Sequence, residues 1–190
     1  KYTVKEVSVE GYETEINDFD ITNRHTPEVI SYKVTKVWND NNNQDGIRPD
    51  SITVNLYADG VKVDFKVLNA SNNWTYVFKN LPKYKDGGIP IKYSLVEDEV
   101  KGYTTNIPDP EETIKETKEL STTITNTHEV EKRDLNVTKT WLDKNNKSNK
   151  RPDFINVNVF ANGNLFTQIT LTKDNNWMFI LSNLDKYKDG

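Results

Sequence analysis

Val34-Thr35-Lys36-Val37-Trp38 is the stretch that decides the fold, because it recurs later in the chain as Val137-Thr138-Lys139-Thr140-Trp141. From there the match runs without a gap at a constant offset of 103 residues. It includes the pairs Arg48-Pro49-Asp50 and Arg151-Pro152-Asp153, Asn72-Asn73-Trp74 and Asn175-Asn176-Trp177, and Lys83-Tyr84-Lys85 and Lys186-Tyr187-Lys188. Residues 34–87 and 137–190 are therefore two copies of the same half-domain.

A second internal repeat links the start of the chain to its middle. Its matching segments are Lys1-Tyr2-Thr3-Val4-Lys5-Glu6 and Lys92-Tyr93-Ser94-Leu95-Val96-Glu97, then Gly11-Tyr12 and Gly102-Tyr103, then Ile21-Thr22-Asn23 and Ile124-Thr125-Asn126. The middle copy carries an acidic insertion near residues 109–119. We therefore expect residues 1–30 to be the C-terminal part of a split domain, residues 31–131 a complete domain, and residues 132–190 the N-terminal part of a split domain.

Apolar residues alternate with period two along much of the chain, which is typical of β-strands. Runs with this pattern are Ile52/Val54/Leu56, Val63/Phe65/Val67 and Trp74/Tyr76/Phe78. Clusters of Asn, Asp, Gly and Pro separate the runs, as turns require. Many short strands in about 100 residues predict an all-β sandwich. For residues 111–120 the sequence leaves a helical turn and a loop open.

Composition narrows the class of protein. The 190 residues are 34% hydrophobic with a net charge of −4, and this acidic balance argues against nucleic acid as a partner. No apolar run approaches the roughly 20 residues that span a bilayer, and without a signal peptide the chain reads as a mature or excised segment. The chain has no cysteine, which fits either a cytosolic protein or a secreted one held together by another kind of cross-link.

Strand alternation places three polar residues at inward positions, because side chains at i and i+2 share a face. They are a lysine, a glutamate and an asparagine, each two residues after an apolar strand residue: Lys36 after Val34, Glu97 after Leu95, and Asn126 after Ile124. Burial penalises the charged forms of a lysine and a glutamate. A neutral lysine amine is a nucleophile, and a protonated carboxyl can polarise the asparagine amide and relay protons. The expected product is a Lys36–Asn126 isopeptide bond, with Glu97 as the promoting acid and ammonia as the leaving group.

The alternative interpretation is a buried Lys–Glu ion pair with an asparagine hydrogen-bonded alongside. The repeat favours the reaction, because the same residue types recur as Lys139 in the last segment and as Glu6 and Asn23 in the first. The site is thus complete in the middle domain and divided between the ends of the chain.

These residues resemble the B-type repeat domain of Gram-positive collagen adhesins, the Cna B family. The resemblance rests on the Val34–Trp38 stretch, Arg48-Pro49, Tyr93–Glu97 and Ile124–Asn126, and it covers nearly the whole chain. It implies an immunoglobulin-like sandwich of inverse topology and a Lys–Asn bond between the first and last strands. It also implies a secreted protein of the bacterial cell wall and surface, in which neighbouring repeats form a stalk or pilus.

The divided copy predicts self-association. Ends that lead to neighbouring repeats are expected at opposite ends of the middle domain, so that the two part-domains of one chain cannot meet. Lys139 of one chain is then expected to face Glu6 and Asn23 of another, a head-to-tail contact that builds filaments or large rings. Either the repeat array has been divided within a domain so that chains can polymerise, or the boundaries of this segment are shifted relative to the domains.

Other functions are weaker candidates. An immunoglobulin-like surface could instead bind a host matrix protein directly, since fold does not fix function. The loop Asp40–Gly46 has a weak similarity to a calcium-binding loop. Ile52 occupies the position at which such a loop needs a glutamate ligand, so we expect a polar turn and no metal. His25 and His128 each follow a candidate asparagine and are expected in linkers. We expect no cofactor, and no enzyme beyond one self-directed turnover per site.

Overall fold

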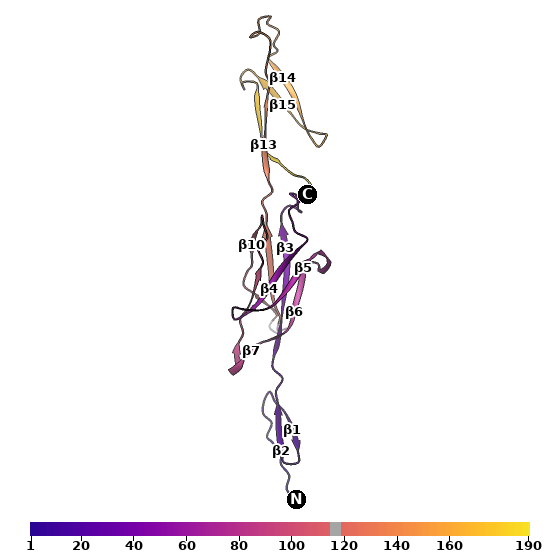
Figure 1. Cartoon of the computed structure of the whole chain (residues 1–190), viewed down its shortest axis with the longest axis vertical. Helices are drawn as coiled ribbons and strands as arrows, with labels where there is room; N and C mark the ends of the chain where they lie inside the picture. The colour runs from indigo at the N-terminus through magenta and orange to yellow at the C-terminus, as the bar shows by residue number, and fades with distance from the viewer. Residues whose placement is uncertain (115–118) are drawn as a thin grey trace. The chain divides into compact units, whose positions relative to one another are not determined.

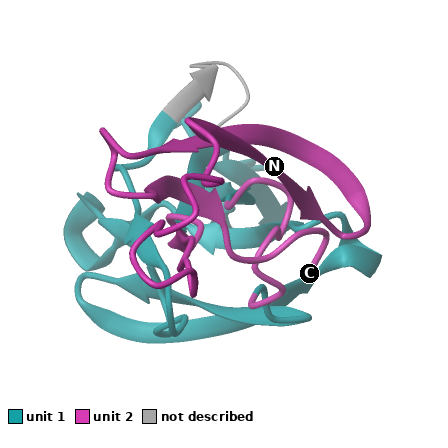
Figure 2. Cartoon of the chain, turned by 90° about the horizontal axis from the view of Figure 1, so that it is seen from above, with its two compact units in different colours: residues 1–39, 48–128 teal, residues 40–47, 129–190 magenta. Residues whose placement is uncertain are grey.

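The computed structural model describes residues 1–114 and 119–190 of the chain. These residues are almost entirely β-strand, and two short 3-10 turns, η1 (Ala70–Asn72) and η2 (Asp86–Gly88), are the helical segments among them. The chain divides into two compact units, which Figure 2 distinguishes by colour. The first contains residues 1–39 and 48–128, and the second contains residues 40–47 and 129–190.

The strands follow one another with short connections, and several are labelled in Figure 1. In chain order they are β1 (Glu13–Asn17), β2 (Asp20–Arg24), β3 (Val29–Asn39), β4 (Ser51–Ala58), β5 (Val61–Asn69), β6 (Thr75–Pro82), β7 (Tyr84–Lys85), β8 (Ile89–Pro90), β9 (Tyr93–Glu97), β10 (Thr104–Asn106), β11 (Glu111–Ile114), β12 (Glu119–Thr127), β13 (Lys132–Thr138), β14 (Phe154–Ala161), β15 (Asn164–Thr172) and β16 (Met178–Asp185).

The middle repeat is built from two sheets. One has the order β10-β12-β3-β6, with β11 also paired to β12, and the other has the order β5-β4-β9. Strands β3 and β12, the first and last long strands of the repeat, run parallel from Ser31 opposite Glu119 to Asn39 opposite Thr127. The other pairs in both sheets are antiparallel. The first and last long strands of the repeat therefore lie side by side over nearly their whole length.

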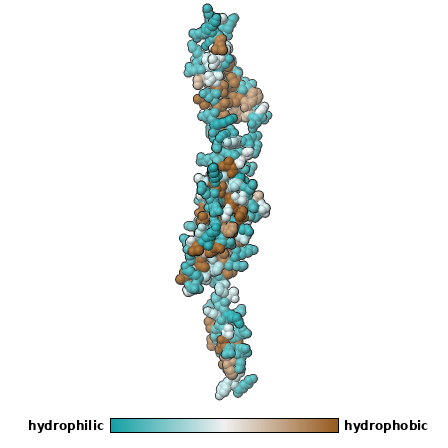
Figure 3. All heavy atoms as spheres, in the orientation of Figure 1, coloured by the Kyte–Doolittle hydropathy of each residue, from teal (hydrophilic) through white to brown (hydrophobic). Residues whose placement is uncertain are grey.

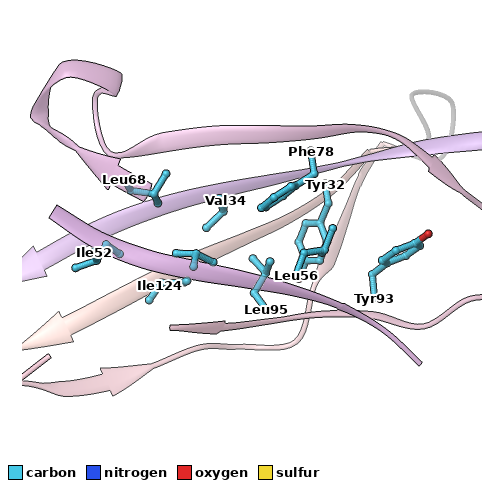
Figure 4. Packing of buried hydrophobic residues seen from close by; sticks show 10 residues of the cluster. Tyr32, Val34, Ile52, Leu56, Leu68, Phe78, Tyr93, Leu95 and Ile124 are labelled. Carbon is cyan, nitrogen blue, oxygen red and sulfur yellow. The ribbon is translucent and has the colours of Figure 1, made fainter. Parts of the chain in front are cut away.

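Alternating side chains from both sheets form the core, as Figure 4 shows. Val34 of β3, Leu56 of β4 and Ile124 of β12 are fully buried. The run Ile52/Val54/Leu56 is buried as a set, which confirms the strand pattern read from the sequence. Burying each large aliphatic side chain contributes roughly 1.5–3 kcal/mol, so this small cluster holds the two sheets together.

Two elements differ in detail from the sequence pattern. Val63, Phe65 and Val67 do form a strand, but their side chains are 53%, 56% and 40% exposed, and Leu68 reaches the core from β5 instead. Alternation reveals the strand period and not which face turns inward. The helical turn or loop expected over residues 111–120 is wrong at both ends, where β11 and β12 pair, and its middle, residues 115–118, lies outside the described residues.

The segments at the two ends of the chain have few buried side chains. The first segment forms the hairpin β1–β2, and the last forms the pairs β13–β16 and β14–β15. A small cluster of Ile169, Leu171 and Trp177 is buried in the last segment. Many other large apolar side chains of the two end segments are exposed, and the brown patches of Figure 3 mark hydrophobic residues at the surface.

Candidate cross-linking site

Lys36 and Glu97 form an ion pair inside the middle repeat. Strand β3 brings Lys36 from one sheet, and β9 brings Glu97 from the other, so the two side chains meet across the core. Lys36 Nζ lies 3.5 Å from Glu97 Oε1, and the side chains are 0% and 1% exposed. A charge pair this deeply buried is stabilising only if its remaining hydrogen-bonding capacity is satisfied. The contact is long for an ion pair, and Glu97 Oε1 has no hydrogen-bond partner among the described residues.

Asn126 is the third residue of the cluster, and it is completely buried. On β12 it lies two residues beyond Ile124, which pairs with Lys36 on the neighbouring strand β3. Lys36 and Asn126 therefore face the same core from adjacent strands. Within the described part of the chain, neither the oxygen nor the nitrogen of the Asn126 amide has a hydrogen-bond partner. A buried polar group left unpaired costs roughly 1–3 kcal/mol, so two such atoms in one amide need an explanation.

Aromatic rings close the site on one side. The Lys36 amine lies 4.3 Å from the centre of the Trp38 ring. Trp38 in turn makes edge contacts with Trp74 at 5.3 Å and with Tyr103 at 5.0 Å between ring centres. Such rings exclude water and lower the local dielectric, which strengthens every electrostatic interaction inside.

Thr105 adds a contact that sequence reasoning did not single out. Its hydroxyl donates to Glu97 Oε2 over 2.9 Å, while the other carboxyl oxygen faces Lys36. Thr105 also stands directly opposite Asn126 in the antiparallel pair of β10 and β12. A signal was available, because Thr14 follows Glu6 at the same spacing of eight residues.

In the first segment, Glu6 and Asn23 lie in direct contact. The Asn23 amide nitrogen donates to Glu6 Oε1 over 2.9 Å, and the Thr14 hydroxyl lies 2.7 Å from Glu6 Oε2. These hydrogen bonds, the one from Thr14 first, hold the pKa of the Glu6 carboxyl below its usual range. Acid and amide of this half-site are thus positioned together on the β1–β2 hairpin and its preceding segment.

In the last segment, Lys139 repeats the surroundings of Lys36. Its amine lies 4.5 Å from the centre of the Trp141 ring, and Trp141 contacts Trp177 at 5.0 Å between ring centres. Lys139 belongs to the second compact unit, whereas Glu6 and Asn23 belong to the first. Each end of the chain thus carries one part of the constellation found whole in the middle repeat.

The remaining sequence candidates have simple local roles. The Asp40 carboxylate accepts a hydrogen bond from the backbone of Asn43, within the polar turn. The rings of His25 and His128 contact the backbone oxygens of Gly11 and Gly102. No cluster of three or more metal-ligating side chains occurs in the parts of the chain that are described. Over the same residues no helix is long and apolar enough to cross a membrane.

Two sheets joined through parallel first and last strands, with repeated half-domains, define the class of protein as an immunoglobulin-like β-sandwich repeat. The model of the Cna protein B-type domain matches residues 1–24, 32–127 and 135–190, and the chain belongs to this family. A similar protein is the collagen adhesin of Staphylococcus aureus, 41% identical over 197 residues that cover 100% of this chain and 16% of that protein.

A solved structure resembles the chain over almost its whole length. It contains two B repeat units of the collagen-binding protein of Staphylococcus aureus and is 40% identical. The match has a TM-score of 0.68 and covers 96% of this chain and 47% of that chain. The chain thus corresponds to a tandem of B-type repeats and spans a small fraction of the adhesin that it matches.

Proposed function

We propose that this chain is a structural stalk segment of a bacterial surface adhesin, whose repeats are locked by self-formed Lys–Asn isopeptide bonds. The observation that carries the proposal is the buried Asn126 amide, which is unpaired at both atoms and faces the same core as the buried Lys36–Glu97 pair from the strand next to that of Lys36. The alternative interpretation, a permanent ion pair, requires the asparagine to be hydrogen-bonded alongside, and no such bond is present among the described residues.

The reaction balances without a cofactor. The Lys36 amine attacks Asn126 Cγ, a C–N bond forms, and the bond from Cγ to Nδ2 breaks. A proton from the lysine nitrogen passes by way of Glu97 to the departing nitrogen, which leaves as ammonia. The product is a neutral amide, so the cost of burying a charged lysine disappears.

Intact mass under denaturing conditions tests this reaction. The wild-type chain should be lighter than its sequence mass by one ammonia, and peptide mapping should find residues 36 and 126 in one branched fragment. Lys36→Met should restore the full mass, whereas Lys33→Met, on the exposed face of the same strand, should not. Succinimide formation at Asn162-Gly163 also releases ammonia, but it would persist in Lys36→Met. A wild-type mass equal to the mass calculated from the sequence would refute the proposal.

We further propose that the two end segments, residues 1–30 and residues 132–190, carry complementary halves of a second site. The last segment has a groove of about 610 Å³ bordered by Leu135, Val159, Phe160 and Asp185. The corresponding space of the middle repeat is filled by β9, where Tyr93 pairs with Ala58 and donates to the Pro82 oxygen. The segment that matches β9 in sequence is Tyr2–Glu6, which is not a strand in the structure, and Tyr2 is 91% exposed.

The register follows from the middle repeat, in which Val54 pairs with Glu97 and Ala58 with Tyr93. The two repeats are offset by 103 residues for β4 and by 91 residues for β9. By these offsets, Val157 should pair with Glu6, and Ala161 with Tyr2. This register would bring Glu6 and Asn23 of one copy beside Lys139 of another, and would add a strand to the open edge of β14. Apolar side chains exposed on both halves, such as Tyr2 and Phe160, would become buried.

Denaturing gel electrophoresis tests the pairing. Concentrated protein should form covalent multimers that lose one ammonia per junction, because the contact joins the two different ends of identical chains. Lys139→Met should abolish the multimers and leave the Lys36–Asn126 bond intact. Monomers that persist at millimolar concentration would exclude pairing between chains. A surface location and a stalk role follow from the adhesin relative, and turnover catalysis forms no part of the proposal.

A further inference from the structure

Both copies of the candidate site have a threonine that bonds the acid and stands opposite the asparagine. Thr14 also bonds the Asn23 oxygen, whereas the Asn126 oxygen has no hydrogen-bond partner among the described residues. Thr105 is the cross-strand partner of Asn126, and Thr14 is the cross-strand partner of Asn23. Directly opposed residues on one face have side chains within contact distance. In each copy the threonine hydroxyl also bonds the Oε2 atom of the acid, at 2.9 Å for Thr105 and 2.7 Å for Thr14.

The half-site on the first segment shows how the three groups connect. Thr14 Oγ1 lies 2.7 Å from Glu6 Oε2 and 2.8 Å from Asn23 Oδ1. The Asn23 orientation is fixed, because its nitrogen donates to Glu6 Oε1. A hydroxyl has one hydrogen to donate, and both neighbours are acceptors when the carboxyl is ionised. Both contacts are hydrogen bonds at once only if Glu6 carries a proton and donates it to Thr14, which then donates to Asn23.

We propose that Thr105 and Thr14 are relay residues, through which the protonated acid polarises the asparagine carbonyl for attack by the lysine. The inference rests on the proposed isopeptide reaction and adds a residue to it. The acid then acts on both sides of the amide, through the threonine at the oxygen and directly at the departing nitrogen. Thr105 itself is an exposed residue, although its hydroxyl bonds the buried Glu97 carboxyl.

The relay leaves the overall balance unchanged. As the lysine nitrogen bonds to Cγ, negative charge develops on the asparagine oxygen, and the threonine hydrogen bond stabilises it. When the tetrahedral centre collapses, the carbonyl reforms and the hydrogen bond weakens. The proton lost by the lysine nitrogen leaves with the ammonia, so acid and threonine end as they began.

The exposed half-site is held in a resting form. There Glu6 is an ionised carboxylate that accepts the hydrogen bond of Thr14, in keeping with its lowered pKa. Thr14 then has no hydrogen left to donate to Asn23. Covering the half-site with a complementary half-domain removes water and so disfavours the ionised form of Glu6. In the middle repeat this covering is already present, because the Glu97 side chain is 1% exposed.

The test follows ammonia loss during refolding of the full chain. Protein kept in denaturant from cell lysis is diluted into buffer, and its intact mass is read over time. Thr105→Val should slow the loss by roughly 100-fold, the effect of deleting a donor to a developing oxyanion. Thr105→Ser, which keeps the hydroxyl, should react at close to the wild-type rate. Thr104→Val, the neighbour that donates to the Thr127 oxygen instead, should react like wild type.

Circular dichroism of each refolded variant separates slow chemistry from failed folding. A folded Thr105→Val chain that reacts as fast as wild type would overturn the relay alone. Equal slowing of the serine and valine variants would also overturn it, since that result indicates a packing role for the methyl group. A wild-type chain that never loses ammonia would overturn the isopeptide proposal and the relay with it.

Discussion

Replacing both members of the buried pair, as Lys36→Met with Glu97→Gln, separates a covalent site from an ion pair by the sign of its effect. If the site is only an ion pair, substituting both charges by neutral groups of similar size should be neutral or stabilising. If Lys36 and Asn126 are bonded, the same double variant loses a cross-link. Single variants cannot make this distinction, because removal of either partner leaves an uncompensated buried charge.

The size of the loss follows from the enclosed loop. About 90 residues separate Lys36 from Asn126, and cross-linking a loop of that length is worth roughly 4.6 kcal/mol in the chain-entropy description. A repeat of about 100 residues has an unfolding entropy of roughly 0.2 kcal/mol per kelvin, so its Tm should fall by roughly 20 °C.

Scanning calorimetry of the full chain measures this shift. The transition of the middle repeat is assigned with Lys139→Met, the equivalent change in the other copy, which should leave that transition in place. An unchanged or raised Tm for the double variant would refute the covalent interpretation. The intact mass of each sample, read before the scan, shows whether the bond had formed.

Three further predictions concern assembly, mechanics and pH. Tyr2→Ala should weaken association between chains at least tenfold in sedimentation experiments, because Tyr2 is the counterpart of buried Tyr93; unchanged association would argue against the groove. In single-molecule pulling, Glu97→Gln should release roughly 300 Å of chain that the wild type withholds; equal extensions would mean that no bond forms. Arg151 lowers the pKa of Asp143, so the turn that they hold should be stabilised above the unfolded carboxyl pKa of about 3.9 and loosen as pH falls through the folded value. Hydrogen exchange should lose this pH response in Asp143→Asn, and an unaltered response would disprove the link.

Internal repetition made most of the fold predictable. The strand runs and the core positions of Lys36, Glu97 and Asn126 could be read from alternation, since each lies two residues from an apolar neighbour. Repeats also tie residues far apart in sequence to equivalent places in space, which a single copy could not do. The parallel pairing of β3 with β12 required the structure or the resemblance, because alternation carries no information about which strands are neighbours.

Thr105 illustrates what the sequence pattern missed. Threonine is common in strands, so its presence is no signal by itself. Its significance depends on the register that sets it opposite Asn126 and on the hydroxyl contact with Glu97. The outward face of Val63, Phe65 and Val67 was equally hidden, because either face of an edge strand can be apolar.

The location of the candidate bond fits a mechanical role better than a role in stability alone. Tension on a repeat enters at the start of β3 and leaves at the end of β12, and these parallel neighbours would be sheared past each other. Lys36 lies near the end of β3 and Asn126 near the end of β12. A bond between them carries force from one strand to the other and leaves the intervening chain without tension. An amide also resists reduction, so the proposed bond would give a chain without cysteine a cross-link that does not depend on redox conditions.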